Sequence, residues 1–211
     1  MATVLDISMS LDGFVAGLND GLGNGLGDGG QPIHNWVMGG QWDYGNETFA
    51  ATGVDRDMLD TMMQSAGAVI VGRRMYDVVD GWGDESPWQI PVFVLTHRGA
   101  PPERRRETPF TYVGDGVRSA LAQARAVAGS KDVVVSGGAN VAQQFLAAGL
   151  VDVLQWHIAP IVLGDGVPLF AHLGRYPVTL TPLVVHSSER ATHIRYRVEN
   201  EPIIVDPVPH R

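Results

Sequence analysis

The chain has 211 residues, a length that one domain can account for, and its 45% hydrophobic content is enough to build a large core. The net charge of −8 argues against general binding to nucleic acids or membrane surfaces, because both need a basic face. The absence of cysteine excludes disulfides, thiolate zinc sites and cysteine nucleophiles. Without a long apolar run or a signal-peptide pattern, we expect a soluble, cytoplasmic protein.

Strand and helix patterns are predicted to alternate along most of the chain. Strands are expected at 3–9, 14–16, 68–72, 91–98, 110–114, 131–138 and 152–164, and helices at 54–67, 73–82, 117–129 and 139–149. Two further strands, 177–188 and 191–199, are expected to close the chain as a hairpin. This order predicts a single α/β domain over residues 1–211, with a mostly parallel central sheet, flanking helices and an antiparallel C-terminal hairpin.

A glycine-rich segment, "GLNDGLGNGLGDGGQP" at 17–32, contains a match to the dinucleotide-binding pattern G-x-G-x-x-G at Gly25, Gly27 and Gly30. That fingerprint requires a strand directly before it and a helix directly after it. Here Pro32 and a stretch without helical period follow, and Thr52 with Asp55 gives the next helix start, as a possible capping box. We therefore interpret the match as chance in a loop rich in glycine.

The predicted strand "VVVSGG" ends at Gly137 and Gly138, and a helix begins at once. Ligands bind beyond the carboxyl ends of strands in open α/β sheets, and the free amides of a helix N-terminus favour an anion there. The amides available for this role belong to Gly138, Ala139, Asn140 and Val141. The alternative is a tight turn that needs glycine for steric reasons only.

Two other predicted strands end in residues that suit phosphate. The strand 68–72 leads into Gly72, Arg73 and Arg74, and the strand 91–98 ends in Thr96, His97 and Arg98. Guanidinium groups bind phosphate in a forked geometry, and the second set could receive a phosphate monoester such as the 2′-phosphate of NADP. Considered alone, Arg73 and Arg74 could be solvated surface charges, and residues 96–98 could be the polar start of a loop. Three such ends in one sheet favour a dinucleotide site.

The chain resembles the dihydrofolate reductase superfamily, and within it the branch of RibD C-terminal-domain-like proteins. The segments that carry the resemblance are "SMSLDGFVAG", "VIVGRRMYD", "PVFVLTHR", "VVVSGGANVAQQFLAAGLVD" and "LQWHIAPIVLGDGVPLF", in the family's order from about residue 3 to 173. The resemblance implies a dihydrofolate reductase-like fold and a reductase that uses NADPH. It implies that Gly72, Arg73 and Arg74 hold cofactor phosphates, that Thr96, His97 and Arg98 lie near the adenosine 2′-phosphate, and that residues 137–141 bind the pyrophosphate.

On the substrate side, the resemblance implies a carboxylate in the helix after the glycine-rich segment. That helix offers Asp55, Asp57 and Asp60, and Asp57 falls nearest the family's spacing before Gly72, so it is our candidate proton donor. Asp55 is its rival as a helix cap, and a solvated helix face is the alternative for each. The loop before the helix departs from dihydrofolate reductases, which makes dihydrofolate doubtful as substrate.

Three further residues are candidates for the substrate pocket. Asp12 could contribute a carboxylate, although stabilising the turn at Gly13 is the alternative. His34 and Trp36 could line the pocket, where a tryptophan makes a platform for a flat heterocycle or simply belongs to the core. His157, inside an apolar strand, is interpreted as a core histidine, and no set of His, Asp and Glu has a metal-ligand spacing.

The predicted activity is hydride transfer from NADPH to a C=N or C=O bond of a small substrate. One alternative is a riboflavin-pathway reductase acting on a phosphoribosylamino-pyrimidine, which would need a second basic site; the only obvious cluster is "ERRR" at 103–106. Another is a non-catalytic nucleotide-binding or sensor protein. We also expect a homodimer, and the resemblance implies that residues 19–40 form a lid over the nicotinamide.

Overall fold

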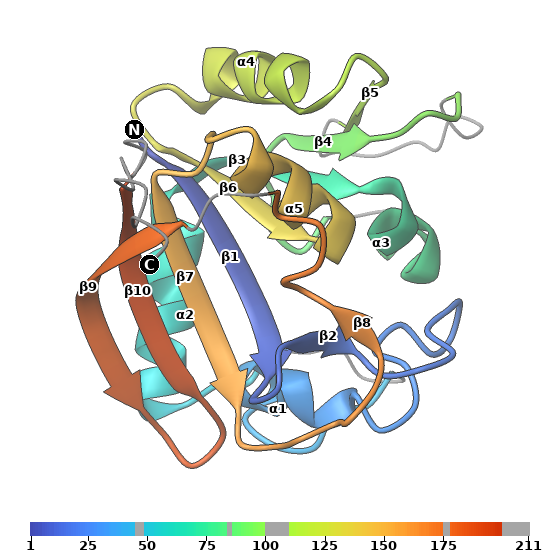
Figure 1. Cartoon of the computed structure of the whole chain (residues 1–211), viewed down its shortest axis with the longest axis vertical. Coiled ribbons are helices and arrows are strands. Elements are labelled where there is room, and N and C mark those ends of the chain that lie inside the picture. The colour runs from blue at the N-terminus through green and yellow to red at the C-terminus, as the bar shows by residue number, and fades with distance from the viewer. Residues whose placement is uncertain (45–48, 84–85, 100–109, 175–177, 200–211) are drawn as a thin grey trace, which may run out of the picture.

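The computed structural model describes residues 1–44, 49–83, 86–99, 110–174 and 178–199 (Figure 1). Its centre is an eight-stranded sheet in the order β5-β4-β3-β6-β1-β7-β10-β9. The strands are β1 Thr3–Ser10, β3 Ala66–Gly72, β4 Val92–Leu95, β5 Phe110–Val113, β6 Asp132–Gly137, β7 Val153–Ala159, β9 Thr179–Ser187 and β10 Thr192–Glu199. Pairings from β5 to β7 are parallel and the last two are antiparallel, so the predicted α/β fold with a C-terminal hairpin is confirmed.

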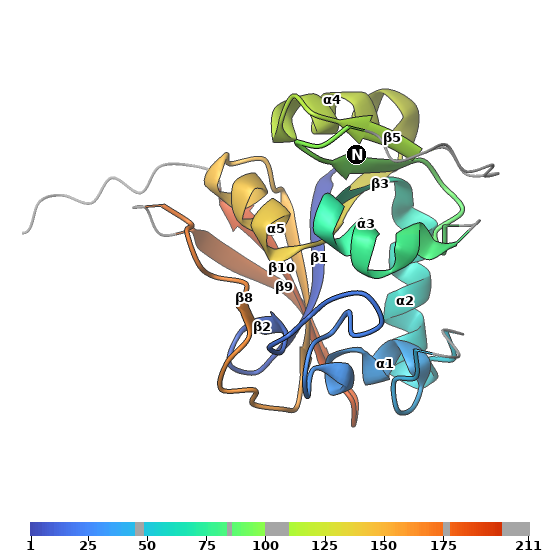
Figure 2. The same cartoon turned by 90° about the vertical axis from the view of Figure 1, so that its right-hand side faces the viewer.

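Helices cover both faces of the sheet, with α1 and α2 on one side and α5 on the other (Figure 2). The helices are α1 Asn35–Met38, α2 Gly53–Ser65, α3 Arg73–Val78, α4 Val117–Ala128 and α5 Ala139–Ala147, with 3-10 turns at Gln31–His34 and Asp80–Trp82. Two short strands, β2 Phe14–Ala16 and β8 Val167–Pro168, pair beside the main sheet. Within the described ranges, no helix combines the length and apolarity that crossing a bilayer requires.

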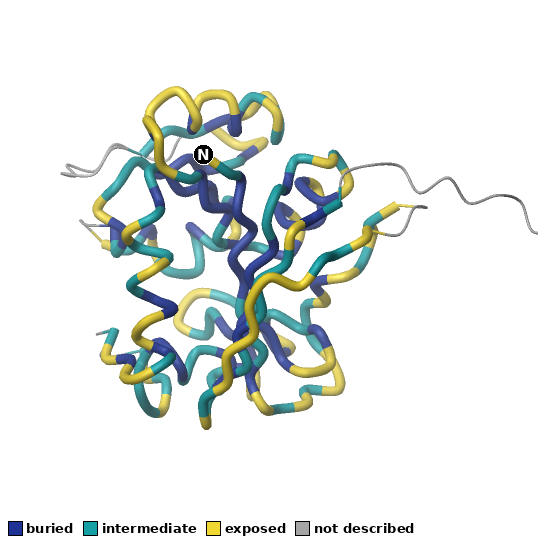
Figure 3. The backbone as a smooth tube through the Cα atoms, turned by 90° about the vertical axis from the view of Figure 1, so that its left-hand side faces the viewer, coloured by how far each residue is buried: buried dark blue, intermediate teal, exposed yellow. Residues whose placement is uncertain are grey.

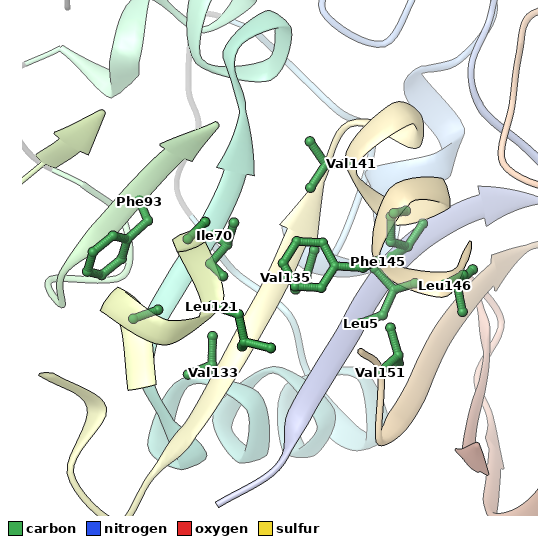
Figure 4. Packing of buried hydrophobic residues seen from close by; sticks show 14 of the residues in the cluster. Leu5, Ile70, Phe93, Leu121, Val133, Val135, Val141, Phe145, Leu146 and Val151 are labelled. Carbon is green, nitrogen blue, oxygen red and sulfur yellow. The ribbon is translucent and has the colours of Figure 1, made fainter. Parts of the chain in front are cut away.

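Side chains of β1 alternate between the two faces, and this alternation positions the functional site. Leu5, Ile7 and Met9 belong to the core cluster that includes Phe145 of α5, which Figure 4 shows packed beside Leu5. On the opposite face, Asp6 is also buried. A carboxylate in the middle of a buried parallel strand needs compensating partners, because burying an ionised group alone is costly.

The predicted elements differ from the structure mainly at their ends and in the shortest pieces. β7 ends at Ala159 because Pro160, which cannot donate to a ladder, follows it. α1, the 3-10 turn before it and β8 were not predicted, since two to four residues are too few to show a period. The capping box at α2 is wrong: no side-chain bond caps Thr52, and the Asp55 carboxylate meets His193 instead. The segment "PPERRRETP" and the C-terminal tail lie outside the described residues.

Candidate functional site

A cavity of about 460 Å³ lies where the glycine-rich segment, β1, α1, α3 and the β6–α5 turn come together. That volume is within the range of small-molecule sites in proteins. The polar side chains in its wall are those of Asp6, Ser8, Asp20, His34, Tyr44, Arg74 and Ser136. Aromatic rings form much of the remaining surface, from Trp36, Trp42, Phe49, Trp82 and Trp88. The cavity therefore has a backbone-lined part at the start of α5, and we call the part formed by Trp36, Trp42 and Phe49, around α1, its aromatic end.

The glycine turn between β6 and α5 forms the backbone-lined part, because Gly137, Gly138 and Ala139 all line the cavity. Gly138 has φ +78°, and a Cβ there would meet nothing nearer than the Gly72 Cα at 3.9 Å. A Cβ on Gly137 would overlap the Met75 sulfur. No side chain caps the N-terminus of α5. The turn thus leaves open space beside uncapped amides, a geometry that suits a phosphate group.

Three other residues were predicted to bind phosphate: Gly72 at the end of β3, and Asn140 and Val141 at the start of α5. In the structure they make contacts within the protein. Asn140 is exposed, and its Oδ1 accepts a hydrogen bond from Gln144 at 2.7 Å. Val141 is buried against Gly72, where a Cβ would come within 2.9 Å of Val141 Cγ2. Glycine at position 72 therefore allows β3 and the start of α5 to approach closely. None of these three residues lines the cavity.

Arg74 lines the cavity and holds the glycine-rich segment against α3. Its guanidinium donates to both carboxylate oxygens of Asp20, at 2.8 and 2.6 Å, and to the Asp20 carbonyl at 2.8 Å. These bonds raise the pKa of Arg74, so its charge is permanent. The pair fixes one side of the cavity by joining two segments that lie far apart in the sequence.

Arg73 and Arg98 meet outside the cavity, at the carboxyl ends of β3 and β4. Arg73 Nε lies 2.7 Å from one oxygen of Asp77, and Arg98 Nη2 lies 2.9 Å from the other. Thr96 is buried and its hydroxyl accepts from the Arg98 amide at 3.0 Å, whereas His97 is exposed. The structure thus brings two guanidinium groups together on one shared carboxylate, although none of these residues lines the cavity.

The glycine-rich segment is a compact loop that covers one side of the cavity. Its backbone folds on itself, with the Gly17 amide bonded to the Leu26 carbonyl at 2.8 Å and the Asp28 amide bonded to the Leu18 carbonyl at 2.7 Å. A Cβ on Gly27, at φ +69°, would overlap the Gly17 carbonyl. Glycine at these positions therefore allows close backbone packing. No strand leads directly into the match and no α-helix leaves it directly, as the sequence interpretation held.

His34 and Trp36 line the aromatic end, as predicted for a substrate pocket. The Trp36 indole N–H donates to Ser8 Oγ at 3.0 Å, and its ring stacks on His157 with centroids 4.2 Å apart. The His34 ring meets Trp42 edge-on at 5.1 Å. Burial, with a smaller effect from His157, lowers the pKa of His34 to about 4, so its imidazole is neutral at physiological pH.

Asp57, the predicted proton donor, does not face the cavity. It is exposed on α2, and its backbone carbonyl accepts a bond from the Thr61 hydroxyl at 2.7 Å. Asp55, two residues earlier, points inward and is only 1% exposed. Residues two apart on a helix do not share a face, and family spacing alone could not resolve which of the two turns inward. Among the described residues, two carboxylates line the cavity, those of Asp6 on β1 and of Asp20, which Arg74 holds.

Asp12 stabilises the turn after β1 and is absent from the cavity wall. Its carboxylate accepts from the Ser10 hydroxyl at 2.6 Å and from the amides of Leu163 and Gly164 at 3.1 and 2.7 Å. These bonds, the Ser10 hydroxyl foremost, lower the pKa of Asp12 to about 2. These contacts support the alternative raised for this residue, that it stabilises the turn, and nothing in the cavity wall supports its assignment to the substrate.

A family model for the RibD C-terminal domain matches residues 2–192. The chain belongs to this family. A putative riboflavin biosynthesis protein from Shewanella sp. PV-4 is similar in structure, with TM-score 0.66, 23% identity and coverage of 94% of this chain and 99% of that one. A deaminase/5-amino-6-(5-phosphoribosylamino)uracil reductase from Thermotoga maritima has TM-score 0.63 and 15% identity, covering 93% of this chain and 56% of that one. Dihydrofolate reductase from Enterococcus faecalis complexed with NADP(H) has TM-score 0.51 and 15% identity, covering 93% and 96%. These likenesses show a shared fold.

Within this RibD-type fold, sequence reasoning missed the buried polar cluster behind the aromatic end. Asp6 lies within the predicted strand 3–9 but was not a candidate site residue. His157 is completely buried, which confirms its interpretation as a core histidine, while His193, which was not a candidate, is 1% exposed. A usable signal was present, because Asp6, Ser8 and Ser10 alternate with apolar residues and so share one face of a buried strand.

Proposed function

We propose that this protein is an oxidoreductase that transfers a hydride from NADPH to a C=N or C=O bond of a small heterocyclic compound. The observation that carries the proposal is a single cavity joining the uncapped turn at Gly137 and Gly138 to an aromatic wall around Trp36. Membership of the RibD C-terminal domain family supports it. So does the shared fold with a pyrimidine reductase and with a dihydrofolate reductase complexed with NADP(H).

The residues around the cavity fit an extended dinucleotide. The amides of Gly138 and Ala139 would hold the pyrophosphate, with Arg74 beside them. The guanidinium groups of Arg73 and Arg98, which Asp77 holds in place, would receive the 2′-phosphate of the adenosine. The nicotinamide would supply the hydride. Trp36 would then orient a flat substrate ring, and the loop around Asp20 would exclude water from it.

The charges of the cavity favour a substrate without a phosphate. Among the described residues of its wall, Arg74 is the only Lys or Arg, and it already pairs with Asp20. A phosphoribosylamino-pyrimidine would need a second cationic group near the aromatic end. The "ERRR" cluster at 103–106 lies outside the described residues. The riboflavin-pathway reaction is therefore our second proposal, distinguished by whether turnover requires a phosphorylated substrate.

Replacing Gly138 by alanine is expected to weaken NADPH binding by about tenfold, which corresponds to about 1.4 kcal/mol. The added methyl group would occupy the open space beside the α5 amides, where only the Gly72 Cα lies within 4 Å. Titration of NADPH fluorescence measures the change. The matched control is Gly129→Ala at the end of α4, which has φ +63° and also meets no atom within 4 Å. Both variants carry similar backbone strain, so equal NADPH affinity in the two would contradict the assignment.

Turnover separates an enzyme from a sensor. We expect the protein to oxidise NADPH in the presence of at least one compound from a panel of heterocyclic imines and carbonyls. Absorbance of the reduced nicotinamide follows the reaction. Tight binding of NADPH without consumption on any member of the panel would favour the non-catalytic alternative, and absence of binding would overturn the cofactor proposal as well.

We further propose that the protein forms a homodimer through β9, the strand at one edge of the sheet. Among the described strands, β9 pairs only with β10, and its exposed course crosses the foreground of Figure 3. Leu183, Val184 and Val185 are each exposed there, so the edge presents apolar side chains on both faces. Val185→Asp is expected to yield monomers in sedimentation velocity, whereas Val127→Asp on α4, with similar exposure, leaves the dimer intact. A monomeric wild-type protein would contradict this proposal.

A further inference from the structure

Four titratable side chains meet beneath Trp36, each contributed by a different element. Asp6 comes from β1, His157 from β7, His193 from β10 and Asp55 from α2. The strand register causes the meeting, because His157 lies opposite Ser8 of β1 on one side and opposite His193 of β10 on the other. All four are nearly or completely buried. We call them the buried acid–histidine cluster.

The contacts within the cluster form a line. His193 Nε2 lies 2.8 Å from Asp55 Oδ1, and the Nδ1 atoms of the two histidines lie 2.6 Å apart. At the other end, His157 Nε2 lies 3.3 Å from Asp6 Oδ1. His157 Nε2 and Asp6 Oδ2 are buried and have no hydrogen-bond partner among the described residues. The line therefore runs from Asp55 to Asp6, and its weakest contact is at the Asp6 end.

The contacts limit how many protons the cluster can hold favourably. Two of the contacts are hydrogen bonds and need one proton each. The third is a 3.3 Å approach of His157 Nε2 to Asp6 Oδ1 without a hydrogen bond, and a proton on either atom would relieve the repulsion of their lone pairs. Two ionised carboxylates and two neutral imidazoles carry only two protons. One contact would then bring two lone pairs together in a buried place, which costs free energy. A third proton removes the conflict and reduces the cluster's net charge from −2 to −1, whichever tautomers the histidines adopt.

The surroundings favour holding this third proton near Asp6. Burial lowers the pKa of His193 in spite of the opposing effect of Asp55, so a doubly protonated His193 is disfavoured. Among the described residues, His34, which is neutral at physiological pH, interacts with His157, and Arg195 bonds Gln155 Oε1 at 3.1 Å; Asp20 and Arg74 share the cavity wall with Asp6 and pair with each other. Of the cluster, only Asp6 lines the cavity. The Trp36 ring lines the cavity and stacks on His157, so it lies between that imidazole and the cavity.

We propose that Asp6 is the acid that protonates the substrate, and that His157, His193 and Asp55 are positioning residues that keep a proton on it. The proposal rests on the proposed reductase function and supplies its missing proton. In the reaction, hydride adds to the carbon of the C=N or C=O bond, and the proton of Asp6 forms the new N–H or O–H bond. Asp6 becomes a carboxylate, and water admitted on product release restores its proton. The sum is one NADPH and one proton consumed for each bond reduced.

The first test counts protons without substrate or cofactor. Nitrogen-15 NMR of the histidine rings at neutral pH reports the protonation of each ring nitrogen, and carbonyl carbon-13 shifts report the state of the two carboxyl groups. We expect three protons in the wild-type cluster and two in Asp6→Asn, whose amide can donate to His157 instead. Two protons in the wild-type cluster would overturn the proposal, whether or not the protein reduces any compound.

The second test measures turnover with NADPH and the panel compound that reacts fastest. Asp6→Asn is expected to lower single-turnover reduction by about 100-fold or more, the usual contribution of a general acid, while NADPH affinity stays unchanged. The matched control Asp57→Asn, exposed on α2, is expected to keep full activity. Wild-type rates in Asp6→Asn would overturn the donor role. Failure of the wild-type protein to consume NADPH would overturn it together with the proposed function, while the proton count remains a separate result.

A third measurement covers the case in which Asp6→Asn fails to fold. Glutamine at position 157 can donate to an ionised Asp6, so it removes the need for the third proton. In His157→Gln we expect the alkaline decline of turnover to begin about one pH unit or more lower than in the wild-type protein, since the donor loses its proton sooner. An unchanged pH profile in a folded His157→Gln protein would show that His157 does not act on Asp6 and would overturn the proposal.

Discussion

Replacing Asp55 by alanine is expected to destabilise the protein by about 2–4 kcal/mol, whereas Asp57→Ala should change stability by less than about 0.5 kcal/mol. Both residues are aspartates on α2, but the side chain of Asp55 points into the protein and that of Asp57 points outward. Asp55 is buried and its carboxylate lies 2.8 Å from His193 Nε2, so its loss leaves a buried imidazole N–H without a partner. Asp57 is exposed, and the Thr61 hydroxyl bonds its backbone carbonyl rather than its carboxylate. Urea denaturation at neutral pH, followed by circular dichroism, measures the difference.

Asp55→Asn is the control variant that keeps the size and shape of the side chain and removes its charge. Its amide oxygen can still accept from His193 while its charge is lost, so we expect a destabilisation between those of Asp55→Ala and the wild-type protein. Equal effects of Asp55→Ala and Asp57→Ala would contradict the buried contact. Unchanged turnover in Asp57→Ala would also dismiss the proton-donor role that family spacing suggests for Asp57.

The fold was predictable because its longer elements have strong local patterns. The strand Ala66–Gly72 is a continuous apolar run, typical of a strand covered on both faces, and the turn at Gly137 and Gly138 marks the change from strand to helix directly in the sequence. The four-residue helix α1 has no such pattern, because one turn cannot show a period. Trp36 was therefore predicted to line the substrate pocket, although the helix that carries it was not predicted.

The site was predictable only where it depends on local sequence. Gly137, Gly138 and Arg74 follow directly from strand ends, and all three line the cavity. The cluster behind Trp36 depends instead on pairing between distant strands: His157 and His193 face each other only because β10 pairs with β7 in one particular register. A shift of one residue would turn His193 to the opposite face. The strand register cannot be read from spacing in one sequence.

Trp36→Ala is expected to have the largest effect of any change in the cavity wall. It removes a buried ring, the hydrogen bond to Ser8 at 3.0 Å and the stacking on His157, so we expect a loss of about 3–5 kcal/mol in the free energy of unfolding. If the ring also supports the substrate, KM for the fastest panel compound should rise by about tenfold or more, a loss of about 1.4 kcal/mol in binding. Trp36→Phe keeps a ring and loses the bond to Ser8, so it should cost about 1 kcal/mol.

Trp156→Ala separates these two effects. Trp156 lies on the neighbouring position of β7 from His157, packs against Phe170 and Tyr196 and does not line the cavity. Its replacement should also destabilise the protein, but KM should remain unchanged. A rise in KM that is equal in the two variants would mean that destabilisation alone explains it. A rise confined to Trp36→Ala, with Trp36→Phe close to the wild-type value, would identify the aromatic face as the part of the residue that the substrate contacts, since only the ring is common to both.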